Sequence, residues 1–169
     1  MRIAVIGNSG SGKSTLAAGL ASELSAATLD LDTVFWEPNQ IAVPRDPALA
    51  RADVAAFCGG HENWVIEGCY ATLAAASFPF SPVLVFLNVS VETCVAHCRA
   101  RPWEPHKYAS KDEQDQRLEF LLKWVSSYPT RDDDMCLKAH RLLFDAYAGR
   151  KVELTENIDA KVLLNGLRV

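Results

Sequence analysis

The chain has no long hydrophobic run, no surplus of basic residues and no regular cysteine framework. Its 169 residues carry a formal net charge of −4, so bulk electrostatics would not hold a polyanion such as DNA. The apolar run Val83–Leu87 has five residues, whereas a membrane span needs roughly 20. The five cysteines are an odd number without framework spacing, which favours reduced thiols. These absences predict a cytoplasmic protein that does not enter a membrane and that binds any anionic ligand at a local site.

No internal repeat or Gly/Ser linker divides the chain, so we expect a single domain over residues 1–169. Short apolar runs alternate with helical patterns, which predicts βαβ units on a parallel sheet. The expected strands cover residues 2–6, 27–29, 64–66, 83–89 and 151–154. The expected helices cover residues 13–24, 47–60, 91–101, 111–127, 131–148 and 158–167. We interpret the acidic residues 132–134 as capping the helix 131–148, because carboxylates stabilise a helix N-terminus.

One segment matches the phosphate-binding pattern G-x-x-x-x-G-K-[ST] in full, between an apolar strand and a helical pattern, which is the context that the pattern requires. Glycines let phosphate oxygens approach the backbone, and the N–H groups at a helix N-terminus bind anions. Lys13 is expected to contact the β and γ phosphates of ATP, and the Ser14 hydroxyl to bind Mg²⁺. The expected nucleotide-binding residues of this phosphate loop are Gly7, Asn8, Ser9, Gly10, Ser11, Gly12, Lys13, Ser14 and Thr15.

Two large classes of phosphate-loop protein are excluded by missing motifs. The chain has no Asn-Lys-x-Asp guanine motif and no Leu-Ser-Gly-Gly-Gln signature, so it is neither a typical GTPase nor an ABC ATPase. It resembles the small P-loop kinases that include shikimate, gluconate and adenylate kinases. It is more closely similar to bacterial proteins named AAA-type ATPases, shikimate-kinase-like proteins or DNA topology modulation proteins. The residues that carry the resemblance are 7–15, 29–32, 35–36, 64–70 and 101–108.

The resemblance implies a three-layer α/β/α P-loop NTPase fold with a five-stranded parallel sheet in the order 2-3-1-4-5. It also implies that the charged helical segment 102–130 is a lid inserted in the domain. Arg99 and Arg101 precede this segment, where lid arginines of such kinases reach the transferring phosphate. The alternative for both is a cation that complements the C-terminal dipole of a helix. His106, Lys107 and Arg131 are further lid candidates.

Three acidic residues follow expected strands. Asp30 and Asp32 resemble the Asp-x-Asp of shikimate kinase, which implies one carboxylate near Mg²⁺ and one near the acceptor hydroxyl. We expect these two side chains to point to opposite faces. We favour Asp30 on the metal side and Asp32 on the acceptor side, and the swapped assignment stays open. Glu67 resembles a Walker B-type acid that contacts metal or substrate, with a surface cap as the alternative. The acceptor pocket is expected to be lined by Phe35, Trp36 and Tyr70.

The leading hypothesis is an ATP-dependent phosphotransferase that acts on a small hydroxylated or phosphorylated metabolite. Its expected catalytic residues are Lys13, Asp32, Arg99 and Arg101, and its expected Mg²⁺ ligands are Ser14, Asp30 and Glu67. A competing hypothesis is an ATP-binding or ATP-hydrolysing regulatory protein that acts on DNA or on a protein partner, although the acidic balance makes nucleic acid an unfavourable partner. A third is an NTPase whose acceptor is water. The acceptor, the choice between ATP and GTP and the oligomeric state stay open at this point.

Overall fold

A five-stranded parallel sheet forms the centre of the computed structural model, which describes residues 1–38, 43–102 and 110–167. Its strand order is β2-β3-β1-β4-β5, and every neighbouring pair is parallel. The sequence and the resemblance predict this fold and order, and both are confirmed. The strands are β1 (Arg2–Gly7), β2 (Ala27–Asp30), β3 (Trp64–Gly68), β4 (Val83–Leu87) and β5 (Lys151–Leu154).

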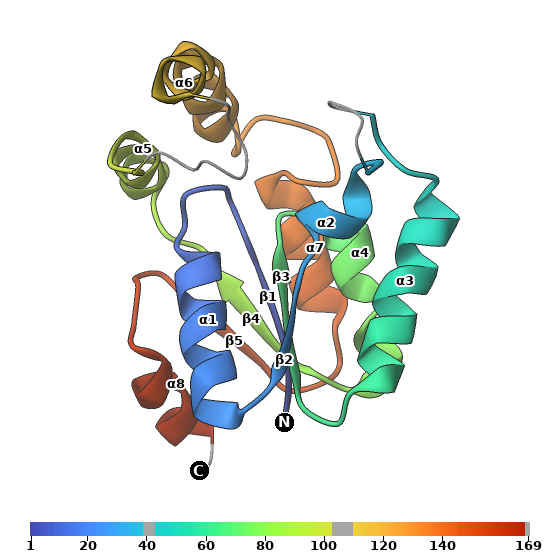
Figure 1. The fold of residues 1–169 in the computed structure, drawn as a ribbon. Coiled ribbons are helices and arrows are strands. Elements are labelled where there is room, and N and C mark those ends of the chain that lie inside the picture. Colours follow the sequence, from blue (N-terminus) through green and yellow to red (C-terminus); the bar gives the residue numbers. More distant parts are fainter. Residues whose placement is uncertain (39–42, 103–109, 168–169) are drawn as a thin grey trace.

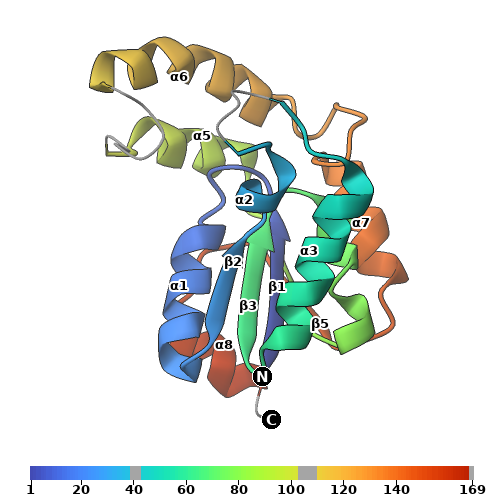
Figure 2. The same cartoon turned by 45° about the vertical axis from the view of Figure 1, so that its right-hand side comes forward.

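Helices cover both faces of the sheet (Figure 1). On one face lie α1 and α8, and on the other α3, α4 and α7, as the turned view of Figure 2 also shows. Helices α5 and α6 pack on each other beyond the carboxyl ends of the strands. The helices are α1 (Lys13–Leu24), α2 (Asp32–Phe35), α3 (Pro47–Gly60), α4 (Ala71–Ala75), the 3₁₀ turn η1 (Phe78–Phe80), α5 (Val91–Arg99), α6 (Lys111–Ser126), α7 (Leu137–Ala146) and α8 (Ala160–Leu167).

The central strand β1 divides the hydrophobic core in two. Ile3 and Val5 belong to the cluster beneath α1 and α8, whereas Ala4 and Ile6 belong to the cluster on the opposite face. All four side chains are fully buried, because successive residues of a strand point to opposite faces and both faces are covered. Burying a side chain such as Ile stabilises the fold by about 1.5–3 kcal/mol. This burial fixes β1 and hence the loop that leaves its carboxyl end.

The expected helix 131–148 differs from the structure at its start. Helix α7 begins at Leu137, and its N-cap is Cys136, whose Sγ accepts a hydrogen bond from the N–H of Ala139. Asp134, which we interpreted as a cap of this helix, instead accepts hydrogen bonds from the N–H and the hydroxyl of Thr72 in α4. The interpretation was wrong because the acidic run caps a helix that is distant in the sequence.

Three short elements are absent from the sequence expectations, namely α2, α4 and η1. Each has five residues or fewer, which is too short to show a helical period. Across the described residues, we find no helix with the length and apolar character needed to cross a bilayer.

Candidate functional site

The phosphate loop joins β1 to α1 at the carboxyl edge of the sheet, and its glycines are required by its own surroundings. Gly10 and Gly12 have φ values of 79° and 95°, in the region that favours glycine. A Cβ atom at Gly10 would collide with the backbone oxygen of Cys94 in α5, and one at Gly12 with the side chain of Asn157. These two glycines therefore allow the loop to pack closely against its neighbours, and they also allow phosphate to approach the backbone.

Three side-chain hydrogen bonds hold the loop, two from other elements and one from the loop itself. His97 of α5 bonds through Nδ1 to the carbonyl of Gly10 at 2.8 Å, and Asn157, before α8, donates to the carbonyl of Ser11 at 2.7 Å. Asn8 of the loop itself donates from Nδ2 to the carbonyl of Val125 in α6 at 3.1 Å. The sequence identified neither the role of His97 nor that of Asn157, because both contacts join residues far apart in the chain.

Lys13 lies at the base of the loop and is 6% exposed. Its Nζ donates to the carbonyl of Asn8 at 2.8 Å and to Sγ of Cys69 at 3.4 Å. Burial alone would lower the pKa of Lys13, but the negative character of Cys69, Glu67 and Asp32 outweighs burial and raises it. The amine therefore stays a cation, as a phosphate-binding lysine must.

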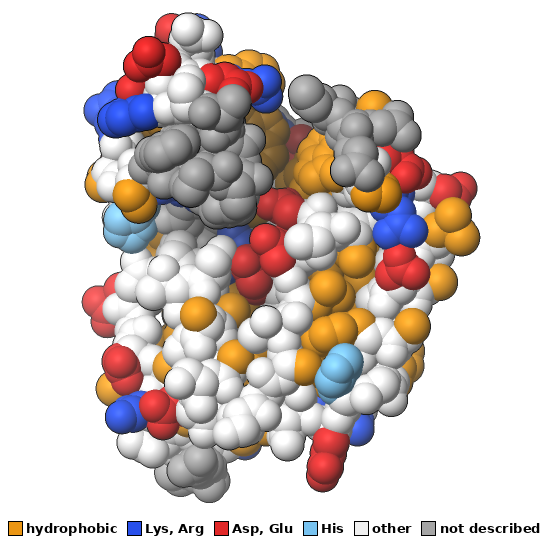
Figure 3. Space-filling model, viewed as in Figure 1, with side chains coloured by type: hydrophobic (Ala, Val, Ile, Leu, Met, Phe, Trp, Pro, Cys, Tyr) orange, Lys and Arg blue, Asp and Glu red, His pale blue; other side chains and the backbone are white. Residues whose placement is uncertain are grey.

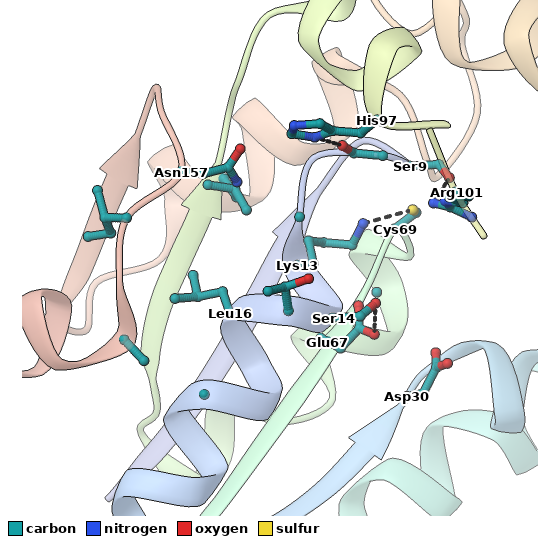
Figure 4. A pocket seen from close by; sticks show the side chains of 18 of the residues that line it. Ser9, Lys13, Ser14, Leu16, Asp30, Glu67, Cys69, His97, Arg101 and Asn157 are labelled. Atoms are coloured by element: carbon teal, nitrogen blue, oxygen red, sulfur yellow. Dashed lines mark hydrogen bonds between the residues drawn. The ribbon is translucent and has the colours of Figure 1, made fainter. Parts of the chain in front are cut away.

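Ser14 and Glu67 form a pair beside the loop (Figure 4). The Ser14 hydroxyl donates to Oε1 of Glu67 at 2.7 Å, and Glu67 is 8% exposed at the end of β3. Its burial excludes the surface-cap alternative. Burial raises the pKa of Glu67, Lys13 and the Ser14 hydrogen bond oppose that rise, and Asp30 and Asp32 add to it. A hydroxyl and a carboxylate oxygen in contact are the hard donors that Mg²⁺ prefers.

A bound Mg²⁺ would fit this pair only together with other oxygens. Among the described residues, no three His, Cys, Asp or Glu side chains lie close enough to hold a metal ion by themselves. Mg²⁺ in phosphate-transferring sites usually keeps several waters and takes its remaining ligands from substrate phosphates. The donor set that Ser14 and Glu67 offer is consistent with such a partial site.

Asp30 and Asp32 lie at the carboxyl end of β2 and face the same cavity as Glu67. The expectation that they point to opposite faces is wrong. Residues two positions apart in a strand point to the same face, so strand geometry does not support that expectation. In addition, β2 ends at Asp30 and Asp32 is the first residue of α2, where its N–H donates to Oδ1 of Asp30 at 2.9 Å. Tyr70 donates its hydroxyl proton to Oδ1 of Asp32 at 2.7 Å. The two carboxylates therefore share one cavity.

The three expected aromatic residues pack together behind Asp32. The Phe35 ring stacks on the Tyr70 ring with 4.2 Å between centroids, and it meets the Trp36 ring edge-on at 4.7 Å. Tyr70 is 3% exposed. The rings are not among the residues that line the cavity, so in this structure they support the carboxylate rather than form the wall.

The two expected lid arginines differ in position. Arg101 lines the cavity, and its Nη2 lies 3.5 Å from the Ser9 hydroxyl. Arg99 is exposed in the last turn of α5 and is not a lining residue. Arg131 lies 3.8 Å above the Trp124 ring and donates to the carbonyls of Trp124 and Met135, which is a packing role. His106 and Lys107 lie outside the described residues.

The loop, the Ser14–Glu67 pair, Asp30, Asp32 and Arg101 surround one cavity of about 790 Å³. Figure 3 shows acidic side chains gathered in the hollow between the elements around α5 and those around α2, and Asp30, Asp32 and Glu67 are the acidic residues that line it there. Loop glycines and Lys13 form the floor, and residues 157–160 close the side near α8. The site thus combines a glycine-rich loop with a buried lysine, a hydroxyl–carboxylate pair and two further carboxylates.

The sequence analysis found most of this cluster but missed several contributors. It did not identify Cys69 as a neighbour of Lys13, nor His140 beneath the turn after β3. Within the segment 64–70, Glu67 and Tyr70 were expected site residues, but Cys69 had no expected role. No local pattern marks the contact of His140 with Cys69, because it depends on how α7 packs on the sheet.

Comparisons with known proteins give the fold. No protein-family model and no curated protein matches the chain. Among solved structures, a shikimate kinase from Bacteroides thetaiotaomicron is 20% identical, with a TM-score of 0.57 over 100% of this chain and 99% of that one. A sugar kinase from Janibacter sp. HTCC2649 is 15% identical, with a TM-score of 0.55 over 98% and 91% of the two chains. A deoxyadenosine kinase from M. mycoides with bound dCTP is 13% identical, with a TM-score of 0.52 over 99% of both. The chain has the fold of these small P-loop kinases.

Proposed function

We propose that this protein is a small-molecule kinase that transfers the γ-phosphoryl group of ATP to a small hydroxylated or phosphorylated metabolite. The observation that carries the proposal is the Ser14–Glu67 hydrogen bond of 2.7 Å beside the buried Lys13, in the same cavity as Asp30 and Asp32. This arrangement offers binding groups for a triphosphate on one side and a carboxylate for an acceptor on the other.

On the phosphate side, Lys13 supplies the positive charge. Its ammonium group has three N–H donors, and its recorded partners are the carbonyl of Asn8 and the thiol of Cys69. A phosphate oxygen is a stronger acceptor than a thiol, so ATP would replace the contact with Cys69. The raised pKa keeps Lys13 charged as the negative charge on the transferring group shifts.

On the metal side, Ser14 and Glu67 would hold Mg²⁺, with Asp30 near enough in the cavity to bind one of its waters. Bound Mg²⁺ would neutralise charge on the β and γ phosphates. Before the ion binds, the Ser14 hydroxyl donates a hydrogen bond to the carboxylate oxygen of Glu67. The pair therefore keeps the two donors together without leaving a buried carboxylate unsatisfied.

On the acceptor side, Asp32 would take the proton of the attacking hydroxyl. Tyr70 donates to Oδ1 of Asp32, which fixes the carboxylate and leaves Oδ2 to accept a hydrogen bond from a substrate. A positioned general base accelerates a reaction by typically 10²–10⁴-fold. Arg101, beside Ser9 on the opposite side, would contact the γ-phosphoryl group during transfer.

The test is ADP release from Mg-ATP measured over a panel of hydroxylated and phosphorylated metabolites, relative to the release without acceptor. A stimulated rate that disappears in Lys13→Ala is the expected result, with a loss of about 10³-fold because the charge on the β and γ phosphates is no longer balanced. Lys161→Ala is the matched control, since that lysine is exposed on α8 and distant from the loop. Hydrolysis that no acceptor stimulates would support the NTPase hypothesis, and a DNA mobility shift that depends on ATP would support the regulatory one.

A further inference from the structure

The end of β3 and the turn that follows it, residues 67–70 (the β3 turn), contribute three contacts to the site. These contacts are Glu67 with Ser14, Cys69 with Lys13, and Tyr70 with Asp32. A displacement of this turn by an ångström would weaken all three together. Because transferring groups tolerate little misplacement, whatever holds the turn also controls the site.

A buried histidine is hydrogen-bonded to the β3 turn. His140, in α7, is 0% exposed, and its Nε2 lies 2.6 Å from the backbone carbonyl of Cys69. Its Nδ1 lies 2.7 Å from the hydroxyl of Tyr128, which follows α6 and is 3% exposed. The imidazole therefore joins three segments: the β3 turn, α7 and the end of α6.

The two partners decide where the imidazole proton lies. A carbonyl oxygen only accepts, so Nε2 must carry the proton and donate it to Cys69. Nδ1 of the neutral ring is then an acceptor, and the Tyr128 hydroxyl donates to it. Burial lowers the pKa of His140 to about 4, so the ring is neutral near pH 7, as this arrangement requires. Both nitrogens of the buried ring are satisfied.

We propose that His140 is a positioning residue of the site: through the carbonyl of Cys69 it fixes the β3 turn where Glu67 contacts Ser14 and the Cys69 thiol contacts Lys13. The inference rests on the proposed function for its consequence in nucleotide binding, but the position of the turn is testable without nucleotide. His140 touches neither ATP nor the acceptor in this scheme. It acts only through the turn.

The thiol of Cys69 is a reporter of that position. Cys69 is partly exposed, whereas Cys58, Cys94, Cys98 and Cys136 are buried. The probe is iodoacetamide, and the readout is the rate of alkylation at Cys69 in the folded protein, followed by peptide mass mapping. His140→Leu removes the donor to a buried carbonyl, and we expect the rate at Cys69 to rise about tenfold. His140→Gln keeps an N–H group for the same carbonyl, and its rate should stay within about threefold of wild type.

Phe144→Leu is the matched control for a loss of packing. Phe144 lies one turn further along α7, and both its ring and the His140 ring pack against Phe86. No hydrogen bond links its side chain to the β3 turn. We expect it to lower the melting temperature without raising alkylation at Cys69. Equal rates in His140→Leu and Phe144→Leu, or an equal rise in His140→Gln and His140→Leu, would overturn the proposal.

Two further measurements complete the test. If His140→Leu does not fold, His140→Asn replaces it: its shorter side chain places the amide beyond reach of the Cys69 carbonyl, and an alkylation rate at Cys69 equal to that of wild type would overturn the proposal. The second measurement compares the affinity for a non-hydrolysable ATP analogue with Mg²⁺ and with EDTA. We expect His140→Leu to lose most of the Mg²⁺-dependent gain, since Glu67 is displaced, while Phe144→Leu keeps it. A wild-type protein that does not bind the analogue would contradict the proposed function, and the alkylation rates would still decide the role of His140.

Discussion

The phosphate loop and helix α6 are joined by the hydrogen bond from Asn8 to the carbonyl of Val125, but they are held to different extents. The loop is bonded on three sides, by His97 from α5, by Asn157 before α8 and by its own Asn8 to the carbonyl of Val125. Helix α6 is fixed mainly at its carboxyl end, where Val125 is fully buried, whereas Phe120 is 74% exposed. The loop is thus held by contacts from several elements, which is what preorganised binding of a ligand requires.

The solvent-facing side of α6 carries charged side chains, whereas its other side packs against α5. Its charged side chains pair along the helix at spacing i,i+4, as Lys111–Asp115, Arg117–Glu113 and Lys123–Glu119, all on the solvent side. Such exposed pairs contribute little stability. Within the expected lid, residues 102–130, Val125 and Tyr128 are buried in the core. We therefore propose that any closure over the cavity would leave these two residues in place.

The largest effect should distinguish two arginines that the sequence treated alike. Arg101 lies beside Ser9 in the cavity, so Arg101→Ala should lower kcat by about 10³-fold with a modest change in KM, because the guanidinium would act mainly in the transition state. Arg99 is exposed at the end of α5, where a cation contributes roughly 0.3–1 kcal/mol to helix stability. Steady-state kinetics and thermal melts of both variants check this. If Arg101→Ala keeps kcat within about threefold of wild type, the catalytic role of this arginine is lost.

A second variant separates ATP binding by the phosphate loop from the transfer step that Asp32 would assist. Asp32→Asn keeps the shape of the side chain and its contact with Tyr70 but removes the proton acceptor, so transfer should fall by about 10²-fold or more. The affinity for Mg-ATP should change little, because the loop is held by other residues. Asp30→Asn is the paired variant, expected to weaken the Mg²⁺ dependence instead. A collapse of Mg-ATP binding in Asp32→Asn would assign Asp32 to the metal side and swap the two roles.

The difference between the two regions also shows what a sequence can predict. The loop, β1 and α1 follow from one contiguous pattern, and α1 begins and ends at the expected residues. The contacts that fix the loop, from Asn157 and His97, join residues 146 and 87 positions apart, and no local pattern records them. The start of α7 was misplaced for the same reason, since Asp134 caps α4. Periodicity predicts elements; the choice of partner depends on how those elements pack.

The third prediction concerns the pH dependence of the free energy of unfolding that comes from His140, which is hydrogen-bonded to Tyr128 just after α6. Burial lowers the pKa of His140 to about 4, Lys13 and Arg131 contribute to that fall, and the hydrogen bond to Cys69 and the charge of Asp133 oppose it. Between pH 6.5 and pH 4 the unfolded chain binds a proton that the folded chain does not, so the free energy of unfolding should fall by about 3 kcal/mol as the pH falls through this window. Above pH 6.5 both states are neutral and this contribution is constant. Urea unfolding at several pH values measures it.

His140→Gln should remove this part of the pH dependence, because glutamine does not titrate. His61→Gln is the matched control at an exposed histidine, and it should leave the slope unchanged. A slope between pH 6.5 and pH 4 that is the same in wild type and in His140→Gln would show that other groups cause it.

The smallest effect should come from cutting the bond between the two regions. Asn8→Ala removes the hydrogen bond to the carbonyl of Val125, which keeps a longer one from the N–H of Tyr128 at 3.3 Å, so the loss of stability should be about 0.5–1.5 kcal/mol. Because this bond ties α6 to the loop, the amides of residues 121–126 should exchange with solvent faster, while the loop keeps its contacts from His97 and Asn157 and so keeps most of its affinity for ATP. Asn88→Ala is the control: it loses a hydrogen bond to Glu153 of β5 that does not involve the loop, and amide exchange in α6 should not change. If amide exchange in α6 does not change in Asn8→Ala, the packing of Val125 rather than this hydrogen bond anchors the helix. The loop and α6 would then be held independently of each other.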